Sequence, residues 1–139
     1  MNRIHKILFL CTGNSVRSQM AEGFARNILP KNCKIYSAGM TPSCIHPSAI
    51  KVMEEVGIDI THQQSKKVSE IPANDIDYVI TLCGDARNQC PVFPRMVAKE
   101  HWPIDAPLAV QGEDGMNNFR SIRDEIKTRV EELAKRLSM

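Results

Sequence analysis

The strongest constraint on the fold is a short apolar segment that passes through a polar turn directly into an amphipathic segment. Residues Ile4–Leu10 are mostly apolar, with β-branched and aromatic side chains, which is typical of a buried strand. Met20, Phe24 and Ile28 then recur four residues apart, and Pro30 would end such a helix. A strand followed at once by a helix is the unit from which parallel sheets are built. The sequence therefore predicts an α/β protein.

The same alternation continues to the end of the chain. Pro47 predicts the start of a second helix, which Gly57 would follow as its C-terminal signal. A last helix is expected over residues 119–137, with Asn117 or Asn118 as its cap. Further strands are predicted over residues 34–37, 77–82 and 100–104. We therefore expect one domain over residues 1–139, with a four-stranded parallel sheet and helices on both faces.

Composition excludes several classes of partner. The chain has 139 residues and a net charge of +2, which is too small to suggest nucleic acid or an acidic membrane surface. Its longest apolar run, Ile7–Cys11, is too short for a membrane span or a signal peptide. We expect a cytoplasmic monomer. Five cysteines suit a disulfide framework poorly; we expect Cys33 to be a packing residue and Cys44 an incidental thiol, and no histidine or cysteine has metal-site spacing.

The turn itself has the composition of an anion-binding loop. It reads Cys-Thr-Gly-Asn-Ser-Val-Arg-Ser from Cys11 to Ser18. Successive backbone N–H groups in such a loop point into one concavity, and the following helix N-terminus adds partial positive charge. Arg17 can grip two oxygens of a tetrahedral oxyanion with its planar fork. We expect the oxyanion to be bound by Arg17 and by the loop residues before it: Thr12, Gly13, Asn14, Ser15 and Val16.

Cys11 begins this loop, where positive potential favours the nucleophilic thiolate. Ser18 can donate a hydrogen bond to the same sulfur, and we expect Asn14 mainly to hold the shape of the loop. A nucleotide-binding phosphate loop would need a Gly-Lys-Ser/Thr sequence that is absent here, and a dinucleotide fingerprint is also absent. The remaining alternative is that Cys11 only ends a buried strand.

The run Cys11–Glu22 closely resembles the signature shared by low-molecular-weight protein tyrosine phosphatases and thioredoxin-coupled arsenate reductases, and residues 36–39 resemble their second strand. Residues 81–85, 90–91 and 101–103 resemble the reductase branch in particular. The resemblance implies a low-molecular-weight phosphatase-like fold and a substrate, arsenate, for which phosphate or sulfate would be an analogue. Cys83 and Cys90, which a phosphatase does not need, distinguish the two branches.

The resemblance also implies a relay of thiols. Cys11 would attack arsenic, Cys83 would then form a disulfide with Cys11 as arsenite leaves, and Cys90 would form a second disulfide with Cys83 that thioredoxin reduces. Residues seven apart on a helix are separated by ~10.5 Å. A disulfide needs Cα atoms within roughly 7 Å. A helical segment between Cys83 and Cys90 would therefore have to unwind.

Three positions depart from the family pattern. The acid that precedes proline there is replaced by Ala106 before Pro107, so we expect Asp105 to act as proton donor, with a plain turn residue as the alternative. Some relatives hold potassium with ligands that match Asn14, Glu22 and Ser37, but their aspartate corresponds to Lys66. We expect the Lys66 ammonium group to replace the cation and no metal to be bound; a solvated lysine is the alternative. Val16 stands where many relatives have a further cysteine.

Two other functions remain open at this point. A low-molecular-weight protein tyrosine phosphatase would use Cys11, Arg17 and an acid while leaving Cys83 and Cys90 idle. A thiol redox sensor or an oxyanion-binding module would leave the arginine in the loop unexplained.

Overall fold

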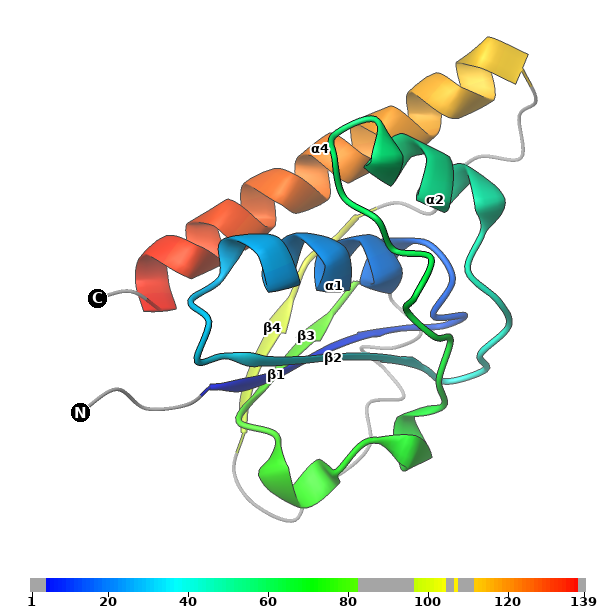
Figure 1. Ribbon diagram of the computed structural model, residues 1–139. Helices are drawn as coiled ribbons and strands as arrows, with labels where there is room; N and C mark the ends of the chain where they lie inside the picture. The colour runs from blue at the N-terminus through cyan, green and yellow to red at the C-terminus, as the bar shows by residue number, and fades with distance from the viewer. Residues whose placement is uncertain (1–4, 83–96, 105–106, 108–111, 138–139) are drawn as a thin grey trace.

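The computed structural model describes residues 5–82, 97–104, 107 and 112–137. Four parallel strands form one sheet in the order β2-β1-β3-β4 (Figure 1). Their bounds are Lys6–Cys11 for β1, Lys34–Gly39 for β2, Tyr78–Thr81 for β3 and Ala98–His101 for β4. The predicted α/β class with a four-stranded parallel sheet is confirmed. Predictions about Cys83, Cys90, Asp105 and Ala106 lie outside the described residues.

Strand β1 is central and is buried on both faces. Its residues Ile7, Leu8, Phe9 and Leu10 are fully inaccessible to solvent. Successive side chains of a strand point to opposite faces of the sheet. Both faces of the sheet are therefore covered at β1, as expected for a parallel sheet.

Among the described residues, the α-helices gather on one side of the sheet in Figure 1, whereas the 3₁₀ turns Val68–Glu70 and Ala73–Asp75 lie on the other side. Of the helices predicted on both faces, this part of the chain therefore has α-helices on one face and 3₁₀ turns on the other. The α-helices are α1 (Arg17–Ile28), α2 (Pro47–Glu54) and α4 (Gly112–Leu137). Helix α4 buries a stripe at spacings of three and four: Phe119, Ile122, Ile126, Val130 and Leu133. No helix within the described ranges is long and apolar enough to cross a membrane.

The largest differences from the predicted boundaries are at the start of α4 and the end of β4. Helix α4 begins at Gly112, so neither Asn117 nor Asn118 caps it; the Asn117 side chain instead accepts a hydrogen bond from Arg120 along the helix surface. Strand β4 ends at His101 although Trp102 and Ile104 are almost fully buried. The Ile104 amide donates to the Trp102 carbonyl, which turns the chain off the sheet while both side chains stay in the core. The apolar residues Trp102 and Ile104 therefore suggested that the strand continues where the chain in fact turns.

The partly buried carboxylate of Glu100 connects β4 to the end of α4. Glu100 accepts hydrogen bonds from the Tyr78 hydroxyl at 2.6 Å and the Trp102 indole at 2.7 Å, and the Arg136 guanidinium binds both of its oxygens. Burial alone would raise the pKa of Glu100, but hydrogen bonds from Arg136, Tyr78 and Trp102 outweigh it and lower that pKa from 4.5 to about 2. Charge-assisted hydrogen bonds of this kind are stronger than neutral ones.

We expect Glu100→Gln to lower the free energy of unfolding at neutral pH by about 1–2 kcal/mol. Because the folded pKa is depressed, this contribution is complete above the unfolded value near 4.5 and is lost as the pH falls toward 2. Urea unfolding at neutral pH and at about pH 3 should show the difference from wild type shrinking. Glu131→Gln, on the exposed face of α4, is the matched control. A difference that is constant with pH would contradict the assignment.

Candidate active site

The predicted loop lies at the carboxyl end of the central strand. Cys11 is the last residue of β1 and is 3% exposed, and α1 begins six residues later at Arg17. Ligands of open parallel sheets bind beyond this edge of the strands. The structure therefore places the candidate nucleophile where the fold commonly holds a ligand.

Backbone hydrogen bonds fix which way the loop's peptide groups point. The segment 40–46 donates amide hydrogens to the carbonyls of four loop residues at 2.8–3.2 Å: Cys11, Thr12, Gly13 and Ser15. The fifth carbonyl, of Asn14, accepts from the Gln19 side chain at 3.0 Å. In a planar trans peptide the N–H points opposite to the C=O. The amides of residues 12–16 therefore point away from these partners and toward one concave side, as an oxyanion site requires.

Asn14 takes the least common backbone conformation of the loop, with φ of 49°. Its side chain is bonded at both ends: Oδ1 accepts from the Lys66 amide at 2.7 Å, and Nδ2 donates to Ser18 Oγ at 2.8 Å. Gly39 lies against the same place, because a Cβ there would come within 2.7 Å of the Thr12 oxygen and 2.8 Å of the Asn14 nitrogen. The prediction that Asn14 holds the loop's shape agrees with these contacts.

Ser18 lies 2.9 Å from the Cys11 sulfur through its hydroxyl oxygen. The Lys66 amide fixes the orientation of the Asn14 side-chain amide, so Ser18 Oγ receives a hydrogen from Asn14. The single hydrogen of the Ser18 hydroxyl can then be donated to Cys11.

Arg17 is held along one edge by the backbone. Its Nη1 donates to the Ile104 carbonyl at 2.9 Å and to the Leu82 carbonyl at 3.2 Å. Nη1 has two hydrogens, so these bonds use both, and the Nε and Nη2 edge keeps the geometry that binds two oxygens of an oxyanion. In the sequence, the two acceptors directly precede Cys83 and Asp105.

Asn14, Glu22 and Ser37, which match the potassium ligands of some relatives, form hydrogen bonds with other groups of the protein. Glu22 is 2% exposed; Arg26 Nε binds one of its oxygens at 2.8 Å, and the Ser37 hydroxyl binds the other at 2.5 Å. The Lys66 ammonium group donates to the Gln64 carbonyl at 3.1 Å, and the cation that binds Glu22 is Arg26. The side-chain oxygens of Asn14, Glu22 and Ser37 thus each have a partner within the protein.

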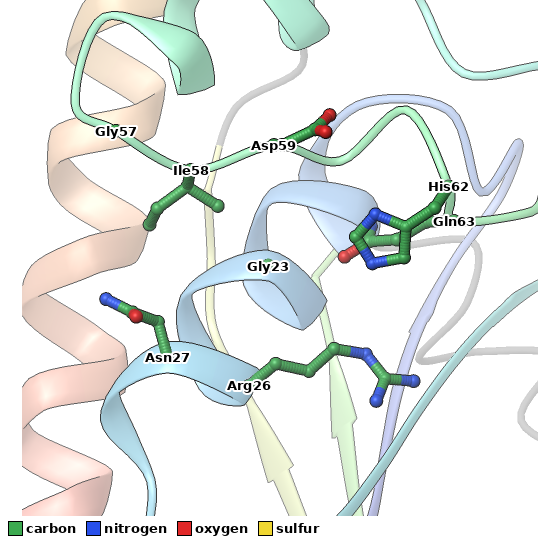
Figure 2. A pocket seen from close by; sticks show the side chains of 8 residues that line it. All are labelled: Gly23, Arg26, Asn27, Gly57, Ile58, Asp59, His62 and Gln63. Atoms are coloured by element: carbon green, nitrogen blue, oxygen red, sulfur yellow. The ribbon is translucent and has the colours of Figure 1, made fainter.

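Two cavities lie on the outer side of α1, away from Cys11. The first, of about 210 Å³, is bordered by Gly23, Arg26, His62 and Gln63 among others (Figure 2). The second, of about 290 Å³, adjoins Glu22 and Lys66 and shares Arg26, His62 and Gln63 with the first. Neither contains a residue of the loop from Cys11 to Arg17.

Cys33 and Cys44, the other thiols among the described residues, lie outside the loop from Cys11 to Ser18. Cys33 packs partly buried against the core, as predicted, and burial raises the pKa of its thiol. Cys44 is exposed in the segment that supports the loop. Sequence reasoning missed the contributions of Gln19, Arg26 and the two carbonyls that hold Arg17. Gln19 lies within the signature run Cys11–Glu22, but its burial is visible only in the structure.

Comparison with known proteins identifies close relatives along nearly the whole chain. Residues 6–139 match the family described as low molecular weight phosphotyrosine protein phosphatase. An arsenate reductase of Bacillus subtilis (strain 168) is 48% identical over 130 residues, which cover 92% of this chain and 94% of that protein.

Solved structures of arsenate reductases have a similar fold over nearly the whole chain. An arsenate reductase in the phosphate binding state has a TM-score of 0.82 and 40% identity, over 96% of this chain and 98% of that one. A thioredoxin-dependent arsenate reductase of Corynebacterium glutamicum has a TM-score of 0.75 and 28% identity, over 97% of this chain and 62% of that one.

We expect Gly39→Ala to weaken binding of inorganic phosphate at least tenfold. The added methyl group would collide with two backbone atoms of the loop, so the loop would have to shift as a whole. Gly23→Ala is the matched control: its methyl group meets the Ile60 side chain at 2.7 Å, so it crowds the core without touching the loop. Phosphate titration followed by NMR measures both. Equal phosphate affinity in Gly39→Ala and wild type would contradict the role of Gly39.

Proposed function

We propose that this chain, which belongs to the low molecular weight phosphotyrosine protein phosphatase family, is an arsenate reductase that reduces arsenate to arsenite through three cysteines and is regenerated by thioredoxin. The observation that carries the proposal is the neighbourhood of Cys11: an oriented set of loop amides, a hydroxyl donor at the sulfur and a guanidinium held with one edge toward the anion. The arsenate reductases at high identity support the choice of substrate.

In the first step, the Cys11 thiolate attacks arsenic. A sulfur–arsenic bond forms and an arsenic–oxygen bond breaks, and the oxygen leaves as water once it is protonated. The loop amides and Arg17 bind the remaining oxygens, where charge is concentrated. We assign the proton to Asp105, which directly follows the Ile104 carbonyl held by Arg17. General acid help of this kind is typically worth about 10²–10⁴-fold in rate.

In the second step, the Cys83 thiolate attacks the Cys11 sulfur. The sulfur–sulfur bond forms, the sulfur–arsenic electron pair passes to arsenic, and arsenic(V) leaves as arsenite. Cys90 then attacks Cys83, which frees the Cys11 thiolate and leaves a Cys83–Cys90 disulfide. Thioredoxin supplies the two electrons that reduce it. The Corynebacterium glutamicum relative is described as thioredoxin-dependent, which supports this donor and, with it, a cytoplasmic site of action.

Strand pairing supports the reach of the second thiol. The Leu82 amide donates to the Leu10 carbonyl at 2.9 Å, and Leu10 pairs with Thr81 in the parallel register. Leu82 thus lies beside Cys11, at the separation of roughly 4.8 Å that neighbouring strands have. Consecutive Cα atoms are about 3.8 Å apart. Cys83 therefore follows a residue that the sheet holds next to the first nucleophile.

A coupled assay with arsenate, thioredoxin, thioredoxin reductase and NADPH tests the proposal. Wild type should consume NADPH through many turnovers. Cys83→Ser should release no arsenite, because nothing resolves the arsenic adduct. Cys90→Ser should release about a single equivalent per chain and stop at the Cys11–Cys83 disulfide. Cys44→Ser, which removes an exposed thiol, is the matched control and should keep full turnover.

The family also contains phosphatases, so aryl phosphate hydrolysis is measured on the same proteins. A phosphatase would hydrolyse the ester equally well in Cys83→Ser, Cys90→Ser and wild type and would consume no NADPH with arsenate. That result would overturn the reductase proposal and leave Cys11 as the nucleophile of an esterase.

We further propose that the chain needs no potassium, because Arg26 already supplies the positive charge at Glu22. The melting temperature should be the same in KCl and NaCl at equal ionic strength. Arg26→Ala should create a preference for potassium, since it leaves a buried carboxylate beside a cavity. Lys66→Ala should not, because its ammonium group binds the Gln64 carbonyl. A clear potassium stabilisation of wild type would refute the proposal.

A further inference from the structure

Two buried glutamines connect α1 and the loop to the segment that follows α2. Gln19 lies in the first turns of α1 and is fully buried, and Gln63 is 8% exposed. Figure 2 shows the Gln63 side chain reaching from the segment after Gly57 toward α1. Buried amides are expensive unless their hydrogens are bonded. The acceptors of these amide hydrogens therefore decide what the pair does in the fold.

Every amide hydrogen of the pair has a defined acceptor. Gln63 Nε2 donates to Gln19 Oε1 at 2.7 Å and to the Gln19 carbonyl at 3.0 Å. Gln19 Nε2 in turn donates to the Asn14 carbonyl at 3.0 Å and to the Gln64 carbonyl at 2.9 Å. The chain of donors runs in one direction and ends on the oxyanion loop.

The orientation of both amides is fixed by these partners. Rotating the Gln63 amide by half a turn would set its oxygen against two acceptors on Gln19. Gln63 Oε1 is buried and has no donor among the described residues, so the two donated bonds alone hold this side chain. Rotating the Gln19 amide would likewise set oxygen against the Asn14 and Gln64 carbonyls.

The last acceptor in this series of hydrogen bonds is the Asn14 carbonyl, at the residue on which the shape of the loop depends. Asn14 is the residue with a left-handed backbone, and its side chain sets the Ser18 hydroxyl toward Cys11. Its carbonyl belongs to the peptide whose N–H is that of Ser15, so the bond from Gln19 turns the Ser15 amide toward the concave side. The other four loop carbonyls are held by backbone amides of residues 40–46.

We propose that Gln19 and Gln63 are positioning residues for the reaction at Cys11. Gln19 holds the peptide between Asn14 and Ser15 in the anion-binding orientation, and Gln63 holds the Gln19 amide in the only orientation that can do so. The inference rests on the proposed use of this loop for a tetrahedral oxyanion, but it does not depend on the relay through Cys83 and Cys90.

The test uses Gln19→Met and Gln63→Met, which keep the length of the side chain and remove its donors. Gln64→Ala is the matched control, because Gln64 is exposed and contributes only its backbone carbonyl to the network. Three quantities are measured on the reduced full chain: melting temperature, the dissociation constant of inorganic phosphate by NMR titration, and the pH profile of Cys11 alkylation by iodoacetamide, read on the Cys11 peptide by mass spectrometry.

We expect Gln19→Met to weaken phosphate binding about tenfold, the typical effect of one buried hydrogen bond at a binding site. Its alkylation profile should move to higher pH, because the Ser15 amide is no longer held toward the concave side of the loop that begins at Cys11. Gln63→Met should move both quantities in the same direction by a smaller amount. Gln64→Ala should match wild type in both.

A purely structural role gives a different pattern. Melting temperatures would fall in both methionine variants, while the phosphate dissociation constant and the alkylation profile stayed within twofold of wild type; that result overturns the proposal. If Gln19→Met does not fold, the same two readouts on Gln63→Met decide. Neither readout uses arsenate turnover, so a chain that fails the NADPH assay can still confirm this inference, and the two failures are distinguishable.

Discussion

The site depends on hydrogen bonds that pull the carbonyls of the Cys11–Ser15 loop outward. Amides of residues 40–46 hold four of these carbonyls, and the Gln19 side chain holds the fifth. Because each peptide group is planar, fixing the carbonyls outward fixes the amides inward. The anion site is therefore a consequence of how β2 continues past Gly39.

Gly39 and Asn14 explain how the two segments come so close. Gly39 has no Cβ to collide with the loop backbone, and Asn14 adopts a left-handed conformation that few residue types tolerate. The strain at Asn14 is offset by three bonds to its side chain and carbonyl. One of those bonds orders Ser18, so the shape of the loop and the position of the Ser18 hydroxyl beside Cys11 have a common cause.

Arg17 joins the anion site to the ends of two other elements. Its Nη1 is bound to the Leu82 and Ile104 carbonyls, at the carboxyl ends of β3 and of the turn after β4. The residues next in the sequence are Cys83, to which the resemblance assigns the role of second thiol, and Asp105, which we expect to be the proton donor. A single guanidinium thus ties the substrate position to the start of both segments. Behind the loop, Arg26 neutralises the buried Glu22 carboxylate, so the protein provides its own counter-charge there.

Much of this protein follows from local sequence. The apolar run into Cys11–Ser18 predicts a strand and a helix, which the structure confirms. The chemistry of the loop predicts that Ser18 contacts Cys11, and the structure has that contact. The use of the loop as an anion site stays a prediction. Periodicity also predicts the face that α4 buries, although its first residue was missed because charged residues precede the apolar stripe. Only tertiary structure shows that Gly39 borders the loop, that Arg26 rather than Lys66 meets Glu22, and that Gln19 and Gln63 connect to Asn14. These pairs lie on different elements, and a sequence pattern records spacing along the chain but not which elements the sheet brings together.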